Sequence, residues 1–400
     1  MADIVVVEAH TKVLDLDGRP RPFVRVLTRS DEKASVLADK LADLADVETV
    51  LIGFHPIRQA TMEGQLAEAL QPVAQAFTAF ALHAFLDTGL ARSIESGMAD
   101  LAALADRHAM DPDRLSALLG YLVNERYLTR VADRWELTGK MRAVARIEPW
   151  YTLLIGGYGQ LLPTIRELLP AGAPFGSRDA VAVGRGSCGI SQYDAIPMIV
   201  SLLSGENALL GRIIDIGCGD GSFLASLIKQ NQAEAGIGLD SDPGSIRAAN
   251  ESIDSWGLAS RLSFQTTTVQ DFIAAQSGDG RRDCFLASFV LQEILEQQGE
   301  ESLRSVLRAI SRRGSRLLVV EVEPGRDGLD MTTGLANRYY NAYFLLHALT
   351  EQRLASRDYW EAIFADCGFS VARSATVNPE VDSTGLEFGL LLSPRSGWVA

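Results

Sequence analysis

A glycine-rich turn is the first stretch of the chain suited to binding a ligand. Residues 212–227, "RIIDIGCGDGSFLASL", pass from an apolar run through three glycines at alternating positions into an amphipathic segment. Glycine at such a turn lets a ligand approach the backbone closely, as in dinucleotide-binding folds. The dinucleotide pattern G-x-G-x-x-G is only partly met. Gly217 and Gly219 fit it, but Ser222 occupies the third position and Gly221 comes one residue early.

Two carboxylates narrow the class of ligand further. Asp215 ends the apolar run before the turn, and a carboxylate there repels phosphates and attracts a cation. Asp240, in "GIGLDSD", ends the next apolar run and is well placed to accept two hydrogen bonds from a ribose. A cationic group near the turn with a ribose beyond it describes S-adenosylmethionine, so we expect this methyl donor as the cofactor.

Two further side chains are candidates for the chemistry of methyl transfer. Displacement at a sulfonium carbon requires a nucleophile held close to the methyl group, opposite the leaving sulfur. A carbon nucleophile also requires an enol or enolate, and therefore a base and an electropositive group at the carbonyl oxygen. His347 in "YYNAYFLLHALTEQ" and Glu293 in "SFVLQEIL" are the predicted catalytic residues. A structural histidine and an acid favoured by a helix dipole are the alternatives.

Candidate substrate contacts lie in the glycine-rich segment and among the arginines. Tyr193 and Gln192, in "GSCGISQYD", are predicted to reach the substrate, although turn packing explains them almost as well. Arg338 is predicted to bind a substrate carboxylate, and Arg353 and Arg185 are alternatives. A lone arginine is usually a solvated surface group, which is the competing interpretation for all three.

The elements that position these residues follow from the rhythm of the chain after residue 205. Strand-like and helix-like segments alternate, beginning with "GRIIDIG", "GSFLASLIKQ", "AGIGLDS" and "PGSIRAANESIDSWG". This alternation predicts an α/β fold with a parallel sheet, helices on both faces, and a ligand site at the carboxyl ends of the strands. Residues 206–400 are accordingly expected to form the cofactor-binding domain.

Residues 61–145 have a different, helical character. After a long apolar helical segment, the pattern is helix, turn, helix and a short hairpin turning at Ala132 and Asp133, which is the order of a winged helix. Eight Arg and Lys stand against ten Asp and Glu over residues 66–145, so a nucleic-acid partner is not expected. Apolar residues on more than one face of residues 66–86 predict a homodimer instead.

The remaining two regions of the sequence give little indication of function. Residues 1–60 read as strand, hairpin, strand, helix and strand, a small α+β appendage of unknown role. Residues 146–205 form a glycine-rich linker, in which "GGYG" at 156–159 and "GRGSCGISQYD" at 184–194 are too rich in glycine for ordinary helix interiors. Tight turns and a pocket wall are the two interpretations of this linker.

The amino-acid composition limits the class of protein and the cellular compartment that we expect. The 400 residues are 47% hydrophobic and 22% charged with a net charge of −14, which fits a globular protein of two or three domains. The four cysteines show no C-x-x-C pair, and no secretory leader follows Met1, so a reduced cytoplasmic location is expected. No apolar run reaches about 18 residues, so no membrane partner is expected.

The motifs "DIGCGDG", "GLDSDP" and "VQDF" resemble the successive cofactor motifs of class I S-adenosylmethionine-dependent methyltransferases, over roughly residues 180–393. The resemblance implies a Rossmann-like sheet in which Asp271 and Ser288 join the cofactor contacts. The preceding helical segment is similar to the dimerisation domain of small-molecule O-methyltransferases. The implied protein has a small α+β N-terminal appendage, a winged-helix dimerisation domain and a methyltransferase domain.

A closer resemblance is to bacterial C-methyltransferases of 2-oxo acids, of the 2-ketoarginine and indolepyruvate type. The stretches "PWYTLLIGGYG", "GSCGISQYDAIP" and "SFVLQEILEQQG" carry it. It implies methylation of carbon 3 of a 2-oxo acid in peptide-antibiotic or other specialised biosynthesis. Some proteins of this type bind a divalent metal through a histidine pair, of which His347 matches one and Glu293 stands for the other. Because Glu293 stands in place of the second histidine, we assign no residues of this sequence as metal ligands.

Other functions stay open on the sequence. An O-methyltransferase would use the same scaffold with a histidine base, and an indole C3-methyltransferase would need no carboxylate clamp. A winged-helix regulator that senses S-adenosylmethionine is disfavoured by the acidic charge balance.

Overall fold

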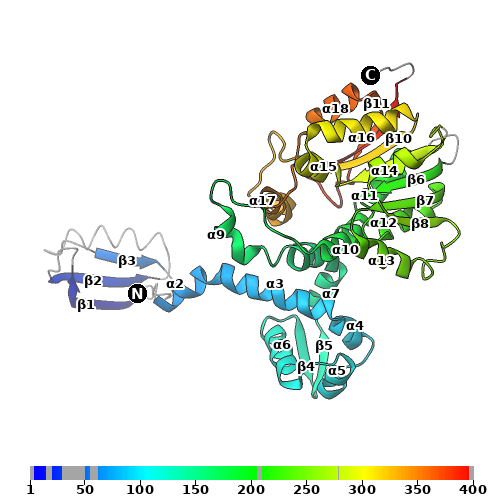
Figure 1. The fold of residues 1–400 in the computed structure, drawn as a ribbon. Coiled ribbons are helices and arrows are strands. Elements are labelled where there is room, and N and C mark those ends of the chain that lie inside the picture. Colours follow the sequence, from blue (N-terminus) through cyan, green and yellow to red (C-terminus); the bar gives the residue numbers. More distant parts are fainter. Residues whose placement is uncertain are drawn as a thin grey trace. The chain divides into compact units, whose positions relative to one another are not determined.

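The computed structural model describes residues 4–14, 20–28, 50–54, 62–204, 210–277 and 279–395. The chain forms two compact units, residues 1–78 and 79–400. Residues 79–145 of the predicted helical domain share the second unit with the cofactor-binding domain, whereas residues 61–78 belong to the first unit. Figure 1 shows the sheet of the second unit and its helices.

The first unit contains a three-stranded sheet. β1 (Ile4–Leu14) pairs antiparallel with β2 (Pro20–Thr28), which pairs parallel with β3 (Val50–Phe54). These strands lie where the sequence predicts them, and the helix expected near residues 30–45 lies outside the described residues. α2 (Met62–Ala69) follows, and α3 (Gln71–Asp87) runs into the second unit.

The helical part of the second unit has the order that the winged-helix prediction requires. The Asp100 and Asp111 carboxylates accept backbone hydrogen bonds and cap α5 (Leu101–Arg107) and α6 (Pro112–Asn124), which follow α4 (Leu90–Glu95). β4 (Leu128–Val131) and β5 (Arg134–Leu137) form an antiparallel hairpin. The hairpin turns at Ala132 and Asp133, both at positive φ, where the sequence places the turn.

The glycine-rich region is helical, which corrects the tight-turn interpretation. Its elements are α7 (Gly139–Arg146), α8 (Glu148–Tyr151), the π-helical η1 (Thr152–Gly157), η2 (Leu162–Thr164), α9 (Ile165–Leu168), α10 (Ala180–Ser191) and α11 (Ala195–Leu203). A Cβ added to Gly186 would lie 2.5 Å from the Leu153 backbone nitrogen. The glycines thus allow α10 to pack directly on the η1 backbone, at a helix-propensity cost of roughly 0.5–1 kcal/mol each.

The second unit is built on a seven-stranded sheet of order β11-β12-β10-β9-β6-β7-β8. The strands are β6 (Leu210–Ile216), β7 (Ala233–Asp240), β8 (Leu262–Thr266), β9 (Asp283–Ser288), β10 (Arg316–Val322), β11 (Phe369–Thr376) and β12 (Glu387–Pro394). The neighbours from β10 to β8 pair in parallel, as predicted. β11 and β12 lie beyond the segments whose alternation predicts parallel strands, and β12 runs antiparallel to both β10 and β11.

Helices cover both faces of this sheet (Figure 1). One core contains side chains of α11, α12 (Ser222–Lys229) and α13 (Pro243–Ser252). The other contains side chains of α14 (Val269–Ala275), α15 (Leu291–Gln298), α16 (Glu300–Arg312) and α18 (Arg357–Asp366). The remaining helical segments, η3 (Ala336–Tyr340) and α17 (Asn341–Leu349), come between β10 and α18 in the chain.

Within the described residues, no single helix is long and apolar enough to cross a membrane. The α2–α3 pair, bent by 48°, meets the length and composition criteria only when its two helices are taken together.

Candidate active site

A cavity of about 380 Å³ lies at the carboxyl ends of the central parallel strands. Its lining includes the ends of β6, β7 and β9, the first residues of α15, and side chains of α10 and α17. Seven of the predicted site residues line it, namely Asp215, Gly217, Gly219, Asp240, Ser288, Glu293 and His347. The sheet therefore brings together residues spread over more than 130 positions of the sequence.

The glycine turn has the geometry that a closely approached backbone requires. Gly217 and Gly219 have φ values of +70° and +55°, a conformation that other residues rarely adopt. A Cβ on Gly217 would lie 2.8 Å from Cγ2 of Val290, at the start of α15. The Gly217 backbone N–H donates to the Leu239 carbonyl at 2.8 Å, which ties the turn to the end of β7.

The carboxylates around this turn lie in a poorly solvated site. Burial, and next the charge of Asp240, raise the pKa of Asp215 to about 8. Burial also raises the pKa of Asp240, whose side chain accepts hydrogen bonds from the N–H groups of Gly219 at 3.0 Å and Asp242 at 2.8 Å. The buried Ser288 hydroxyl has no hydrogen-bond partner. Unfilled polar groups and a bare turn fit a cationic, hydroxyl-bearing ligand such as S-adenosylmethionine.

Asp271 lies outside the cavity lining and has a structural partner. The Thr268 hydroxyl donates to its carboxylate at 2.8 Å, and the Asp271 backbone N–H donates to the Thr268 oxygen at 3.1 Å. This reciprocal arrangement caps α14. Its neighbours Thr268, Val269 and Gln270 line the cavity in its place.

His347 is a buried, uncharged histidine in the cavity wall. Burial is the main cause that lowers its pKa to about 3, and the charge of Arg178 lowers it further. Nδ1 lies 2.8 Å from the Tyr343 carbonyl, which can only accept, so we assign the ring proton to Nδ1. Nε2 is then an unprotonated acceptor, 3.4 Å from the Gln292 amide nitrogen. The ring also stacks on Tyr343 with centroids 3.8 Å apart.

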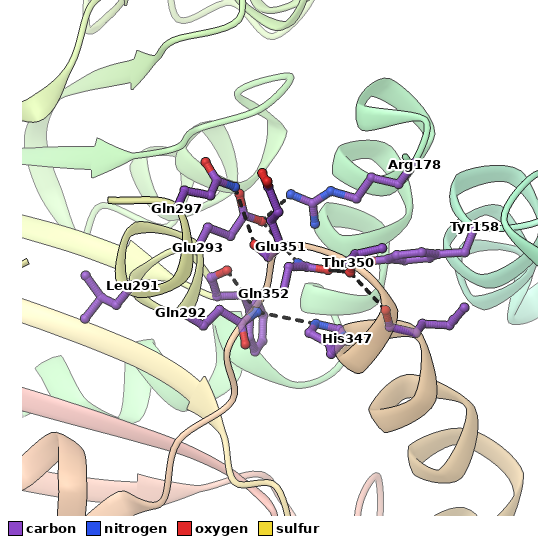
Figure 2. A network of polar contacts seen from close by, with 12 residues as sticks. Tyr158, Arg178, Leu291, Gln292, Glu293, Gln297, His347, Thr350, Glu351 and Gln352 are labelled. Carbon is purple, nitrogen blue, oxygen red and sulfur yellow. Dashed lines mark hydrogen bonds and ion pairs between the residues drawn. The ribbon is translucent and has the colours of Figure 1, made fainter. Parts of the chain in front are cut away.

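Gln292, rather than Glu293, is the residue of α15 that faces His347 (Figure 2). Gln292 is buried, and its amide nitrogen also donates to the Phe289 carbonyl at 3.2 Å. Its side-chain oxygen has no partner. Glu293, which the resemblance pairs with His347, lines the same cavity but directs its carboxylate to Arg178.

Glu293 instead belongs to a polar network around Arg178 (Figure 2). The Arg178 NH2 nitrogen lies 2.6 Å from Glu293 Oε1, and the Gln352 amide donates to the same oxygen at 3.2 Å. The Gln352 oxygen accepts from the hydroxyls of Tyr158 at 2.8 Å and Thr350 at 3.0 Å. Arg178 NH1 is buried and makes no hydrogen bond within the described ranges, so its N–H groups are available to a substrate anion in the cavity.

The predicted substrate residues do not line the cavity. The Tyr193 hydroxyl donates to the Arg146 carbonyl at 3.0 Å, and the Gln192 amide donates to Ser226 at 3.0 Å. Arg338 is exposed on η3. The two alternative arginines do not line the cavity either. Arg185 pairs with Asp87, and Arg353 is exposed.

Sequence reasoning missed two groups of lining residues. Arg178 precedes α10 in a stretch without regular structure, and no local pattern distinguishes it from other arginines. The second group lies beyond the end of β10, where Asp194 and Glu387 are buried carboxylates beside Tyr339. "SQYD" contains Asp194, so the glycine-rich segment does reach the cavity, but through a different residue from those predicted.

Among the described residues, no group of three or more His, Cys, Asp or Glu side chains is arranged to hold a metal ion. All four cysteines lie within the described ranges and are free thiols. The assigned site residues therefore include no metal ligand.

Known proteins similar to this chain are methyltransferases. A family model described as "Methyltransferase domain" matches residues 213–314. A 2-ketoarginine methyltransferase of Streptomyces arginensis is 39% identical over 336 residues, which cover 84% of this chain and 98% of that protein. An indolepyruvate C-methyltransferase of Streptomyces griseus is 27% identical over 260 residues, with coverages of 64% and 74%.

A solved structure shows the same fold. It is an O-methyltransferase from neocarzinostatin biosynthesis in complex with S-adenosylmethionine and 2-hydroxy-5-methyl naphthoic acid. It matches with a TM-score of 0.51 at 18% identity, covering 79% of this chain and 96% of that chain. Together with the identity shared along almost the whole length of the first relative, these matches show that the chain belongs to the family of class I S-adenosylmethionine-dependent methyltransferases that includes 2-ketoarginine methyltransferase.

Proposed function

We propose that the protein methylates carbon 3 of a small 2-oxo acid. The observation that carries the proposal is an uncharged, buried His347 in the same cavity wall as Arg178, the only Lys or Arg among the described lining residues. A base and a cation are the two groups that enolate formation next to a carbonyl requires. The two relatives named for 2-oxo acids, 2-ketoarginine and indolepyruvate, support the same substrate class.

The cofactor would lie over the carboxyl ends of β6 and β7. Asp240 would accept the ribose hydroxyls, the Gly217–Gly219 turn would contact the amino-acid part, and Asp215 would favour its positive charge. Ser288 offers a free hydroxyl at the end of β9. When bound, S-adenosylmethionine supplies an electrophilic methyl group on a sulfonium.

The chain's own groups would prepare the nucleophile. Arg178 NH1, which has no protein partner, would bind the carboxylate and the 2-oxo oxygen of the substrate. His347 Nε2 would remove a proton from carbon 3, giving an imidazolium and an enolate whose negative charge faces Arg178. The enolate carbon would then be the nucleophile for the methyl group that the bound cofactor supplies, with the thioether as the leaving group, and the His347 imidazolium would release its proton to solvent. Glu293 and Gln352 would hold Arg178 in place.

The low pKa of His347 is consistent with this role. Burial without a counter-ion disfavours the imidazolium in the empty cavity. A bound carboxylate and a developing enolate bring negative charge into the same cavity, which raises the pKa of the imidazole when it is needed as a base.

The test is a panel of acceptors incubated with methyl-labelled S-adenosylmethionine. The panel contains aliphatic and aromatic 2-oxo acids, indoles without a carboxylate, and phenols, and NMR locates the new methyl group. We expect a carbon–carbon bond at carbon 3 of a 2-oxo acid. A methyl group on oxygen, or on an indole that has no 2-oxo acid, would instead establish an O-methyltransferase or an indole methyltransferase.

We further propose a cytoplasmic homodimer with a role in specialised biosynthesis, such as that of a peptide antibiotic. Four free thiols favour a reducing compartment. Exposed apolar side chains on α2, on α3 and between them, including Leu66, Leu70, Val73 and Phe77, favour a dimer contact there.

A further inference from the structure

Two buried carboxylates line the part of the cavity farthest from the cofactor turn. Glu387 begins β12, which lies beyond β10 in the strand order, whereas the cofactor residues end β6 and β7. Asp194 precedes α11, a helix that packs on β12. Relative exposures of 5% for Glu387 and 9% for Asp194 show that both are removed from solvent.

One oxygen of the Glu387 carboxylate has no hydrogen-bond partner within the described part of the chain. This atom, Oε1, is buried. The only Lys or Arg among the described lining residues, Arg178, is paired with Glu293. A buried carboxylate without a cation or a donor is unfavourable, so its persistence in a cavity wall indicates a ligand that completes it.

The surrounding titratable groups give the same indication. Burial, and then the charges of Asp194 and Asp382, raise the pKa of Glu387, and burial raises that of Asp194 to about 7. Asp382 is satisfied by the Tyr340 hydroxyl at 2.5 Å and the Thr384 N–H at 2.8 Å. Simultaneous ionisation of Glu387 and Asp194 is thus disfavoured, and a bound cation would favour it.

On the basis of the proposed function, we propose that Glu387 and Asp194 bind a guanidinium or ammonium group at the end of the substrate's side chain. The cavity then has two electrostatic ends. Arg178 receives the 2-oxo carboxylate, and the carboxylate pair receives the cation, with Tyr339 near that pair. A substrate that bears opposite charges at its two ends is held in one orientation, with carbon 3 nearer to the Arg178 end.

Two substrates that differ only in the terminal group test this. They are 5-guanidino-2-oxopentanoate and its isostere with a neutral side chain, 5-ureido-2-oxopentanoate. In the wild type, we expect kcat/KM for the guanidino acid to exceed that for the ureido acid by roughly 10- to 100-fold, the range for hydrogen bonds to a charged group. Equal values for the two acids would overturn the inference.

Glu387→Gln is the main variant because it keeps the size of the side chain and removes the charge. It should lower kcat/KM for the guanidino acid by roughly 10- to 100-fold and leave that for the ureido acid within about threefold. Its thermal stability should equal or exceed that of the wild type, since no protein partner is lost. Glu380→Gln, an exposed site in the segment before β12, is the matched control and should change neither substrate.

Asp194→Asn provides a second variant, because an amide oxygen can still accept from the Ala195 N–H as Asp194 does. An unchanged preference for the guanidino acid in both variants would overturn the inference while leaving 2-oxo acid methylation intact. If no 2-oxo acid is methylated, the proposed function fails. In that case, calorimetry of the guanidino and ureido acids on enzyme loaded with S-adenosylhomocysteine tests the inference independently of catalysis. Equal affinities for the two acids would overturn the inference.

Discussion

The Gln292 and His347 Nε2 atoms lie 3.4 Å apart, while the next residue along the chain, Glu293, directs its carboxylate to Arg178. Adjacent residues at the start of α15 therefore have separate tasks. One contacts the candidate base, and the other holds the candidate cation. The division supports the proposal that His347 is the base and Glu293 a positioning residue.

Exchange of the substrate's carbon 3 hydrogens tests the assignment of the base. Deprotonation precedes methyl transfer in the proposed reaction, so the enzyme should accelerate exchange with deuterium oxide even without a methyl donor. His347→Ala should reduce both exchange and methylation by about 10²–10⁴-fold, the usual contribution of a general base. Affinity for S-adenosylhomocysteine, measured by calorimetry, should stay unchanged. Full activity in the folded variant would exclude His347 as the base.

Arg178 should act on the 2-oxo acid and not on the cofactor. Arg178→Gln removes the charge and the open NH1 group, so kcat/KM for the 2-oxo acid should fall by roughly 10- to 100-fold. Arg185→Gln is the matched control, because Arg185 lies on α10 and pairs with Asp87 outside the cavity lining. A similar loss in both variants would show that the effect is not specific to the cavity.

Asp240 should determine cofactor affinity. Asp240→Ala removes the predicted ribose contacts and should weaken binding of S-adenosylhomocysteine by about 1.5–3 kcal/mol, as expected for hydrogen bonds to a charged group. Glu251→Gln, at an exposed position on α13, is the control. Isothermal calorimetry measures both, and equal affinity of Asp240→Ala and wild type would remove Asp240 from the cofactor site.

Asp215 should make the ligand-free protein less stable as pH rises. Its folded-state pKa is about 8 against an ordinary value of 3.8, so the folded chain retains a proton that the unfolded chain releases between these values. The free energy of unfolding therefore falls with rising pH in this window, by about 1 kcal/mol per pH unit from this group. Thermal unfolding of Asp215→Asn and wild type should differ more at pH 8 than at pH 5. A constant difference, like that expected for the exposed Asp279→Asn, would contradict the pKa shift.

The dimer prediction rests on α2 and α3. Phe77 is 67% exposed, and a charge at this position should break an apolar contact between two copies. Phe77→Glu should convert a dimer to a monomer in light scattering at micromolar concentration. Gln75→Glu adds the same charge to the same helix without removing an apolar group and should stay dimeric. A monomeric wild type would reject the prediction outright.

The family and the fold class could be predicted from sequence because their signals are local. Asp215, Gly217, Gly219 and Asp240 lie at or just beyond the ends of apolar strands, and parallel strands bring their carboxyl ends to one edge. The matches to known methyltransferases confirm the family and its methyl donor. The sequence makes no prediction for the direction of β12, because an apolar strand carries no mark of its direction.

The substrate side of the cavity depends on contacts between distant positions. Arg178 and Glu293 are 115 positions apart, and nothing near either residue indicates the other. The helical state of the glycine-rich segment was missed for a related reason. Gly186 is needed for a backbone contact with Leu153, and that contact exists only after two helices have packed.

The close approach of Gly217 to Val290 links the two halves of the reaction. The turn that would hold the cofactor and the segment that leads into Gln292 are in van der Waals contact, with no room for a side chain between them. A shift of the turn on cofactor binding would therefore also shift the start of α15. In that case each ligand changes the affinity of the other by the same factor. The small size of Gly217 is thus required for close packing of the turn against the start of α15, as well as for access of the methyl donor to the turn.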